Sequence, residues 1–240
     1  YIRGAITKFA HLHFTASKNS YKRVLSMWEN EKNIFNVWAI WLDWINKSKL
    51  YTKKELSHFL WLDNKKKWIL LLQHPTISDI SYEKQINNVL LVLKNIDAEK
   101  IIIYPNSDEW SSIYIENIEK YKDKNSFHLF ENINRKYYLS LLNIIDIIVW
   151  NSSSGIIESW FFWVHVLNIW SRQKWREKWA NVIDVNYSKV DILKNINKLL
   201  NLSKINILNS ENPYYKWWAV KKIINVLASI DDFNILFDEK

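Results

Sequence analysis

Only 2 of the 240 residues are glycine, 3 are proline, and none is cysteine. Without cysteine the chain can form neither a disulfide nor a thiolate metal site, which fits a reducing compartment. It also lacks an apolar run long enough to span a bilayer, because Asn143 and Asp146 interrupt the longest one, residues 137–150. We therefore expect a protein of the cytoplasm that has no membrane partner.

The scarcity of glycine is matched by an excess of tryptophan, which occurs 15 times. Together the two residue types reach about the 7% that glycine alone usually supplies. Trp150 precedes the Ser-rich residues 151–155, and Trp217 follows the turn-like residues 212–216. We hypothesise that most of the tryptophans are UGA codons that the source organism reads as glycine. Trp44 and Trp68 lie away from turns and are the two that we expect to be genuine.

The net charge of +8 raises the question of a nucleic-acid partner. The lysines, however, are spread along the chain, and the densest run is only Lys65-Lys66-Lys67. An A/T-rich coding sequence explains the abundance of Lys, Asn and Ile, so we expect no nucleic-acid partner. Contents of 48% hydrophobic and 24% charged residues are those of a globular chain.

Apolar runs of strand length alternate with periodic segments of helix length. The predicted strands are Leu12–Thr15, Ile34–Val37, Trp68–Gln73, Ile101–Tyr104, Phe127–Phe130, Ile145–Val149, Val164–Asn168 and Val182–Asp184. The predicted helices lie near residues 17–27, 53–60, 81–95, 110–121, 134–143, 155–162, 188–201 and 213–229, and Thr52 with Glu55 predicts a capping box. This alternation predicts an α/β fold with a Rossmann-like parallel sheet.

Polar residues follow three of the predicted strands, at the edge where open α/β sheets bind ligands. These loops carry His74, Asn106 and the Ser-rich residues 151–155, the last followed by Glu158. Hydroxyl groups at a helix start suit a phosphate or diphosphate, and Glu158 could accept hydrogen bonds from sugar hydroxyls. A fourth cluster, residues 171–178, has four cations that could clamp phosphates. The alternatives are a simple helix cap and a solvated loop.

Other catalytic signatures are absent from the sequence. His11 and His13 alternate with apolar residues, which favours a structural role on one strand face over a metal pair. No carboxylate or histidine cluster has metal-ligand spacing, so we infer no metal site and no cofactor. A serine hydrolase has no support either, because no Gly-x-Ser-x-Gly elbow occurs, even with tryptophan read as glycine.

With glycine read at the suspect positions, a series of motifs keeps the order and spacing of one family. The motifs are Ile2-Arg3, Ala5-Ile6-Thr7-Lys8, His11-Leu12-His13-Phe14, Asn36-Val37-Trp38, Trp41-Leu42-Asp43, Gln73-His74-Pro75, Pro105-Asn106 with Asp108, Trp150-Asn151-Ser152-Ser153 with Gly155 and Glu158, and the run Asn168–Val182. They resemble the UDP-N-acetylglucosamine 2-epimerase family. The last run resembles most its hydrolysing branch, which serves sialic and nonulosonic acid biosynthesis and has an Arg-Gln-x-Gly-Arg pattern there. Gly4 and Tyr215 depart from the family pattern, which has His and Gly at these places.

The resemblance implies a two-domain fold like that of the B-type glycosyltransferases, with UDP bound between the domains. Residues 1–45 would form the end of the N-terminal domain and the crossover to the next domain. Residues 46–212 would form the C-terminal UDP-binding domain, and residues 213–240 would form a closing helix. In this resemblance His74, Ser152 and Ser153 would contact the diphosphate, and Arg172 would approach the phosphates or the sugar. Asn106 and the backbone near Ile133 would line the uridine side, and Glu158 would bind the ribose hydroxyls. We expect a homo-oligomer when the protein is full length.

The reaction implied is elimination of UDP to a 2-acetamidoglucal-type intermediate, to which water adds. The product would be N-acetylmannosamine or a related free sugar. The family's catalytic carboxylates lie mostly in the N-terminal domain, so we expect a C-terminal fragment that is inactive alone. The alternatives are a non-hydrolysing 2-epimerase, a glycosyltransferase of the same fold, and a carbohydrate-binding protein that uses exposed tryptophans.

Overall fold

The computed structural model describes residues 2–45, 49–152, 154–169, 176–202, 214–216 and 218–230. Its strands are β1 (His13–Thr15), β2 (Ile34–Asn36), β3 (Trp68–Leu72), β4 (Glu99–Ile103), β5 (Phe127–Phe130), β6 (Ile147–Trp150), β7 (His165–Ile169) and β8 (Val182–Val185). Its α-helices are α1 (Ile2–Phe9), α2 (Lys18–Leu25), α3 (Lys53–Leu60), α4 (Tyr82–Lys94), α5 (Ser111–Glu119), α6 (Arg135–Ile144), α7 (Ser154–Phe161), α8 (Lys189–Leu200) and α9 (Ala219–Ala228). Each predicted strand is found within two residues of its expected bounds, and α1 was not predicted.

The chain divides into two compact units. The small unit consists of residues 1–45 and 211–240, and the large unit consists of residues 46–210. The large unit contains a six-stranded sheet with the order β5-β4-β3-β6-β7-β8. All neighbouring strands in this sheet pair in parallel. The predicted α/β fold with a parallel sheet is therefore confirmed.

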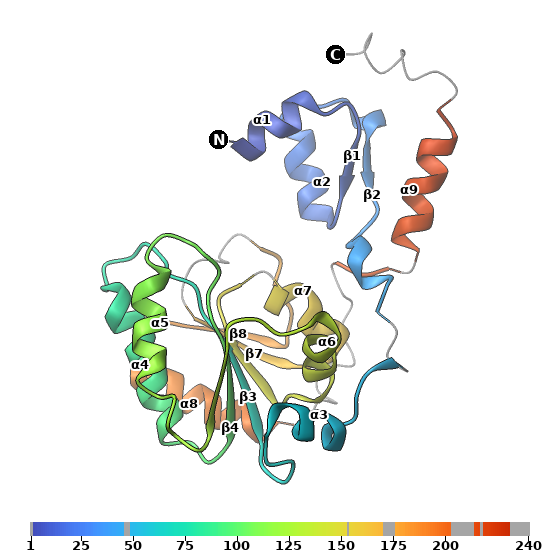
Figure 1. Cartoon of the computed structure of the whole chain (residues 1–240). Helices are drawn as coiled ribbons and strands as arrows, with labels where there is room; N and C mark the ends of the chain where they lie inside the picture. Colours follow the sequence, from blue (N-terminus) through green and yellow to red (C-terminus); the bar gives the residue numbers. More distant parts are fainter. Residues whose placement is uncertain are drawn as a thin grey trace. The chain divides into compact units, whose positions relative to one another are not determined.

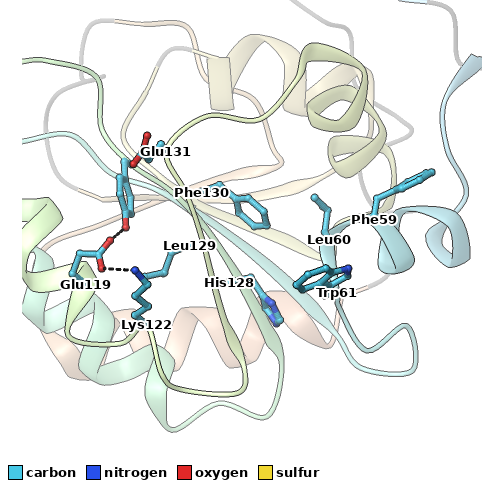
Figure 2. Close-up of a pocket in the computed structure, with 10 residues that line it drawn as sticks. Phe59, Leu60, Trp61, Glu119, Lys122, His128, Leu129, Phe130 and Glu131 are labelled. Carbon is cyan, nitrogen blue, oxygen red and sulfur yellow. Dashed lines mark hydrogen bonds and ion pairs between the residues drawn. The ribbon is translucent and has the colours of Figure 1, made fainter.

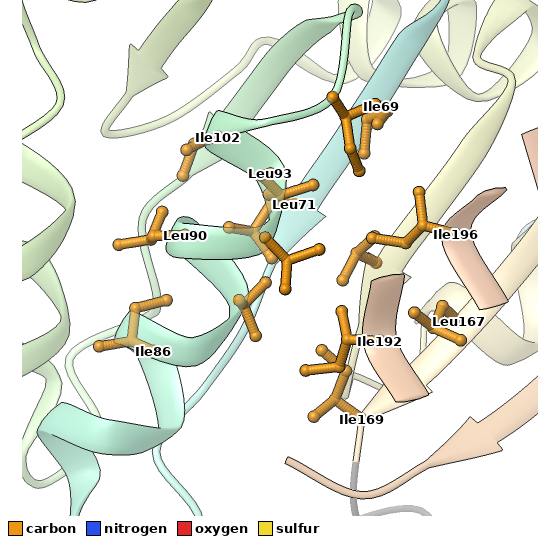
Figure 3. Close-up of a cluster of buried hydrophobic side chains, with 14 of the residues drawn as sticks. Ile69, Leu71, Ile86, Leu90, Leu93, Ile102, Leu167, Ile169, Ile192 and Ile196 are labelled. Atoms are coloured by element: carbon orange, nitrogen blue, oxygen red, sulfur yellow. The ribbon is translucent and has the colours of Figure 1, made fainter. Parts of the chain in front are cut away.

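Helices cover both faces of the large sheet. In Figure 1, α4, α5 and α8 lie on one face, and α3, α6 and α7 lie on the other. Successive strand residues point to opposite faces, and Leu70 and Leu71 of β3 are both fully buried. Figure 3 shows the core on the first face, where Leu90 of α4 and Ile192 of α8 belong to the same cluster as Leu71. Burial on both faces explains why the strands are nearly continuous runs of Ile, Leu and Val.

The chain reverses its direction of travel across the sheet next to β3. From β3 it proceeds to β4 and β5 on one side, and it then crosses to β6 on the other side of β3. The carboxyl ends of β3 and β6 are level, because Leu72 pairs with Trp150. Open α/β sheets bind ligands in the crevice outside the strands at such a reversal. The loops that follow β3 and β6 are therefore the expected place for a ligand site.

Local signals explain where α3 begins. The Thr52 hydroxyl accepts a hydrogen bond from the backbone N–H of Glu55 at 3.3 Å, and the Glu55 carboxylate accepts one from the Thr52 N–H at 2.8 Å. These reciprocal bonds satisfy two donors that a helix start would otherwise leave without partners. The predicted capping box is therefore confirmed.

The small unit pairs β1 with β2 in parallel and includes α1, α2 and α9. The Nε2 of His13 lies 3.2 Å from the buried carboxylate of Glu29, which also contacts Lys8 at 2.9 Å. Burial opposes the charge on Glu29, but hydrogen bonds from Lys8 and His13 outweigh it and hold the pKa of Glu29 below its ordinary value. These contacts give His13 a structural role in this unit.

Candidate functional site

Asn151 joins the loops that follow β3 and β6. Its side chain is fully buried, and its Oδ1 accepts a hydrogen bond from the His74 N–H at 2.8 Å. Its Nδ2 donates to the His74 carbonyl at 2.8 Å and to the Thr76 hydroxyl at 3.3 Å. The side-chain amide thus continues the backbone pairing beyond the ends of the two strands. It fixes the backbone at His74, one of the predicted site residues.

Gln85, in the first turns of α4, holds the rest of the loop after β3. Its Nε2 donates to the Thr76 carbonyl at 2.8 Å, to the Ser78 hydroxyl at 3.0 Å and to the Ile80 carbonyl at 2.8 Å. Gln85 is fully buried, so these bonds form away from competing water. The loop between His74 and α4 is therefore organised around one side chain that the sequence analysis did not single out.

Two tyrosines complete the environment of Gln85. The hydroxyl of Tyr114, from α5, donates to Gln85 Oε1 at 2.8 Å, and the hydroxyl of Tyr187 donates to the same atom at 3.0 Å. Burial, followed by the proximity of Tyr187, raises the pKa of Tyr114 far above its ordinary value. The Tyr114 hydroxyl therefore stays protonated and remains a hydrogen-bond donor at any physiological pH.

His74 also faces the loop that follows β4. Its Nδ1 lies 3.2 Å from the Asp108 carboxylate; the His74 side chain is buried, and that of Asp108 is 45% exposed. Asn106 is exposed, and its carbonyl accepts bonds from the Ser111 hydroxyl at 2.6 Å and from the Asp108 N–H at 2.7 Å. The structure thus brings His74 next to the loop that carries Asn106, as expected for the carboxyl ends of adjacent parallel strands.

The start of α7 lies directly after β6. Ser152, half-buried, precedes the helix, and Glu158, one turn inside it, is buried. The first N–H groups of a helix have no partners within it and carry the positive end of the helix dipole. The arrangement is suited to bind an anionic group close to His74 and Asn151. Ser153 and Arg172, which were also predicted to contact the diphosphate, lie outside the described residues.

Ile133 follows β5 and is half-buried. Next to it, the Asn134 side chain caps α6 by accepting a hydrogen bond from the Lys136 N–H at 2.9 Å. Ile133 therefore lies at the same edge of the sheet as the other predicted residues, two strands away from β3. Its backbone contact with a uridine stays a prediction.

A separate pocket of about 520 Å³ lies beside the edge strand β5 (Figure 2). Trp61, at the end of α3, and His128 and Phe130 of β5 contribute to its wall. None of the predicted site residues lines it. Its position at the sheet edge separates it from the reversal point between β3 and β6.

Two further properties concern only the described residues. They contain no group of three or more His, Cys, Asp or Glu side chains placed to hold a metal ion. Among them, no helix has both the length and the apolar character needed to cross a membrane.

Residues 1–228 match the family model described as UDP-N-acetylglucosamine 2-epimerase. The chain belongs to this family. It is 34% identical over 209 residues to the UDP-N,N′-diacetylbacillosamine 2-epimerase (hydrolyzing) of Legionella pneumophila, a match that covers 87% of this chain and 55% of the relative. It is 35% identical over 194 residues to the GDP/UDP-N,N′-diacetylbacillosamine 2-epimerase (hydrolyzing) of Campylobacter jejuni, with coverages of 79% and 50%. The chain thus spans about half the length of these relatives.

A solved structure of the family shares the fold. The UDP-GlcNAc 2-epimerase from Neisseria meningitidis bound to UDP-GlcNAc has a TM-score of 0.75 and 19% identity, covering 92% of this chain and 62% of that one. The predicted family and the GT-B-like class of its fold are therefore confirmed. The similarity at this identity concerns the fold and carries no residue roles.

Proposed function

We propose that the full-length protein is a hydrolysing UDP-sugar 2-epimerase and that this chain supplies its UDP-binding half. The observation that carries the proposal is the convergence of His74, Asn151 and the start of α7 at the reversal point of the sheet. In support, two relatives at 34% and 35% identity carry hydrolysing 2-epimerase names. The implied reaction eliminates UDP from a 2-acetamido sugar, and water then adds to give the free 2-epimerised sugar.

The negative charge of the departing UDP is what this half of the protein would stabilise. Helix N–H groups and the helix dipole at the start of α7 are fixed in place, so they need no reorganisation as the charge develops. The Asp108 carboxylate lies 3.2 Å from Nδ1 of His74, so a contact with the diphosphate would be made through the Nε2 edge. Ser152 would add a hydroxyl donor, and Glu158 would accept hydrogen bonds from the ribose hydroxyls.

The names of the relatives narrow the proposed substrate. Two of them refer to N,N′-diacetylbacillosamine, and a third, 31% identical, is the polysialic acid biosynthesis protein P7 of Escherichia coli. We therefore propose that the reaction supplies 2-epimerised amino sugars for the synthesis of sialic or related nonulosonic acids. The substrate would be a UDP sugar with an acetamido group at C2. The enzyme would be a cytoplasmic homo-oligomer.

The test is a product analysis with the full-length protein. Incubation with UDP-N-acetylglucosamine and with its diacetamido relative, followed by NMR, should show UDP and a free 2-epimerised sugar. A 2-epimerised sugar still joined to UDP would instead identify the non-hydrolysing reaction. Transfer of the sugar to an added acceptor would identify a glycosyltransferase.

Substitution of Glu158 by glutamine should weaken UDP binding about tenfold, because a neutral amide replaces a charged acceptor at the ribose. Isothermal titration calorimetry on the full-length protein measures the change. Glu116→Gln is the matched control, since Glu116 is exposed on α5, and it should leave UDP affinity unchanged. A UDP analogue without the ribose hydroxyls should bind the Glu158→Gln and Glu116→Gln variants equally well. If Glu158→Gln lowers the affinity for UDP and for this analogue by the same factor, Glu158 does not contact the ribose.

A further inference from the structure

Every left-handed position in the described part of the chain is occupied by tryptophan. Six residues other than glycine have a positive φ, and they are Trp28, Trp38, Trp61, Trp110, Trp163 and Trp218, with φ between 56° and 76°. Bulky side chains rarely adopt this conformation, because Cβ crowds the following carbonyl oxygen. Asparagine, which tolerates it and is abundant here, occupies none of these described positions.

Two of the six tryptophans end helices at the place where glycine normally stands. After α3, the Leu62 N–H bonds to the Ser57 carbonyl at 2.9 Å, across the left-handed Trp61. After α7, the Val164 N–H bonds to the Ser159 carbonyl at 2.9 Å, across the left-handed Trp163. This six-to-one bond is the mark of the Schellman motif, whose left-handed residue is usually glycine.

At three of these positions side-chain packing does not account for tryptophan. Trp28, Trp61 and Trp218 are 94%, 84% and 68% exposed. Trp218 precedes α9 without capping it: Asp43 accepts the hydrogen bond from the Val220 N–H instead, at 2.9 Å. An exposed ring on a left-handed backbone combines strain with little burial, so the fold gains little from the side chain.

The two glycines and one tryptophan provide the contrast. Gly4 and Gly155 lie within α1 and α7, and neither has a positive φ. Trp68, in β3, has no exposed surface, and its indole N–H donates to the Asp63 carbonyl at 2.8 Å. Tryptophan therefore behaves as a true core residue at position 68, whereas the six left-handed positions have the backbone of glycine.

We propose that the natural protein carries glycine at the six left-handed positions and that their codons are UGA, read as glycine in the source cells. The inference rests on backbone conformation and is independent of the proposed enzymatic function. It also changes the reading of the pocket in Figure 2, because Trp61 forms part of its wall. With glycine at position 61 the indole part of that wall is absent.

The structural half of the proposal is tested by thermal unfolding of recombinant full-length protein. Trp61→Gly and Trp163→Gly should each raise Tm by about 2–4 °C, because glycine removes the strain of a left-handed Cβ. Trp61→Ala removes the ring but keeps the Cβ, so it should raise Tm less. The proposal is overturned if the Tm of Trp61→Gly is no higher than that of Trp61→Ala. It is also overturned if both glycine variants have a lower Tm than the parent.

Two tryptophans outside the left-handed region serve as matched controls. Trp44 is 75% exposed, an exposed fraction similar to the 84% of Trp61. Trp44→Gly should therefore leave Tm within about 2 °C of the parent value. Trp68→Gly should lower Tm by more than about 6 °C, because it leaves a cavity and an unpaired carbonyl. A rise in Tm at all four positions would mean that any tryptophan loss stabilises the chain, which contradicts the proposal.

The decoding half is tested on the source cells. Mass spectrometry of tryptic peptides that contain positions 61, 110 and 163 should show glycine, and the gene should read UGA there and UGG at position 68. Tryptophan in these peptides overturns the proposal, as do UGG codons at the left-handed positions.

Discussion

Replacing Gln85 with alanine is expected to lower the free energy of unfolding by about 3–5 kcal/mol. The side chain is fully buried and binds the carbonyls of Thr76 and Ile80 as well as the hydroxyls of Tyr114 and Tyr187. Each buried partner left without a hydrogen bond costs about 1–3 kcal/mol, and only some of them can regain one with water. The loss should be visible as a lower midpoint in urea unfolding.

Two further variants separate the polar network from packing. Gln85→Met keeps most of the volume but none of the hydrogen bonds, so it should lose nearly as much stability as alanine. Lys84→Ala, at the exposed neighbouring position in α4, should change stability by less than about 0.5 kcal/mol. A methionine variant as stable as the parent would show that the hydrogen bonds contribute little.

The pH dependence of the Gln85 contribution follows from the tyrosines. The pKa of Tyr114 is raised by burial in the folded protein, so its hydroxyl remains a donor when an unfolded tyrosine would ionise. A group with a raised folded-state pKa contributes its stability below the unfolded pKa and loses it above that value. The difference between the parent and Gln85→Ala should therefore persist up to about pH 10.

The strands were predictable because burial on both faces leaves a direct signal in the sequence. Runs such as Trp68–Leu72 and Ile147–Trp150 are apolar at every position, and both are buried throughout except Leu72, which is half-buried. Helix α1 has a weaker signal: Ile2, Ile6 and Phe9 stand at helical spacing, but the helix is only eight residues long and has no acidic residue in its first turn. These three apolar residues are exposed within the described chain, so α1 has no buried face there.

The edge of the sheet that carries the candidate site was predictable, and the internal support of its loops was not. His74, Asn106 and Ser152 were expected because parallel strands end at a common edge. The roles of Asn151 and Gln85 depend on partners brought together by folding: Asn151 and His74 are 77 residues apart. The signal that could have identified Gln85 is its position on the apolar face of α4, next to the buried Ile86. A polar residue there must find partners inside the protein.

Trp150 is the tryptophan with the closest relation to the proposed site. A Cβ atom on Gly155 would lie 2.9 Å from Cγ of Trp150, so the indole rests directly on the first turn of α7. Trp150 is 1% exposed, and its indole N–H has no hydrogen-bond partner among the described residues. The ring therefore lies beside the helix start at which a diphosphate would bind, and it contributes no donor to that site.

Trp150→Gly is accordingly expected to strengthen UDP binding at least about tenfold, equivalent to about 1.4 kcal/mol. The substitution clears the space beside α7 and allows the backbone to approach the diphosphate closely. Calorimetric titration of the full-length protein with UDP measures the effect. Removing a buried ring also leaves a cavity, so affinity is the informative quantity, and Trp150→Ala provides a second variant with a smaller change in backbone freedom.

Trp160→Gly is the matched control for this experiment. Trp160 lies near the other end of α7, and its indole N–H also has no partner among the described residues. Its ring stacks on Trp163, with centroids 6.1 Å apart, instead of on the helix start. Its loss should change stability and leave UDP affinity unaltered, because the proposed diphosphate site lies at the opposite end of α7. Equal gains in affinity at positions 150 and 160 would show that relief of strain in α7, and not space at its N-terminus, controls binding. No gain at position 150 would place the diphosphate elsewhere.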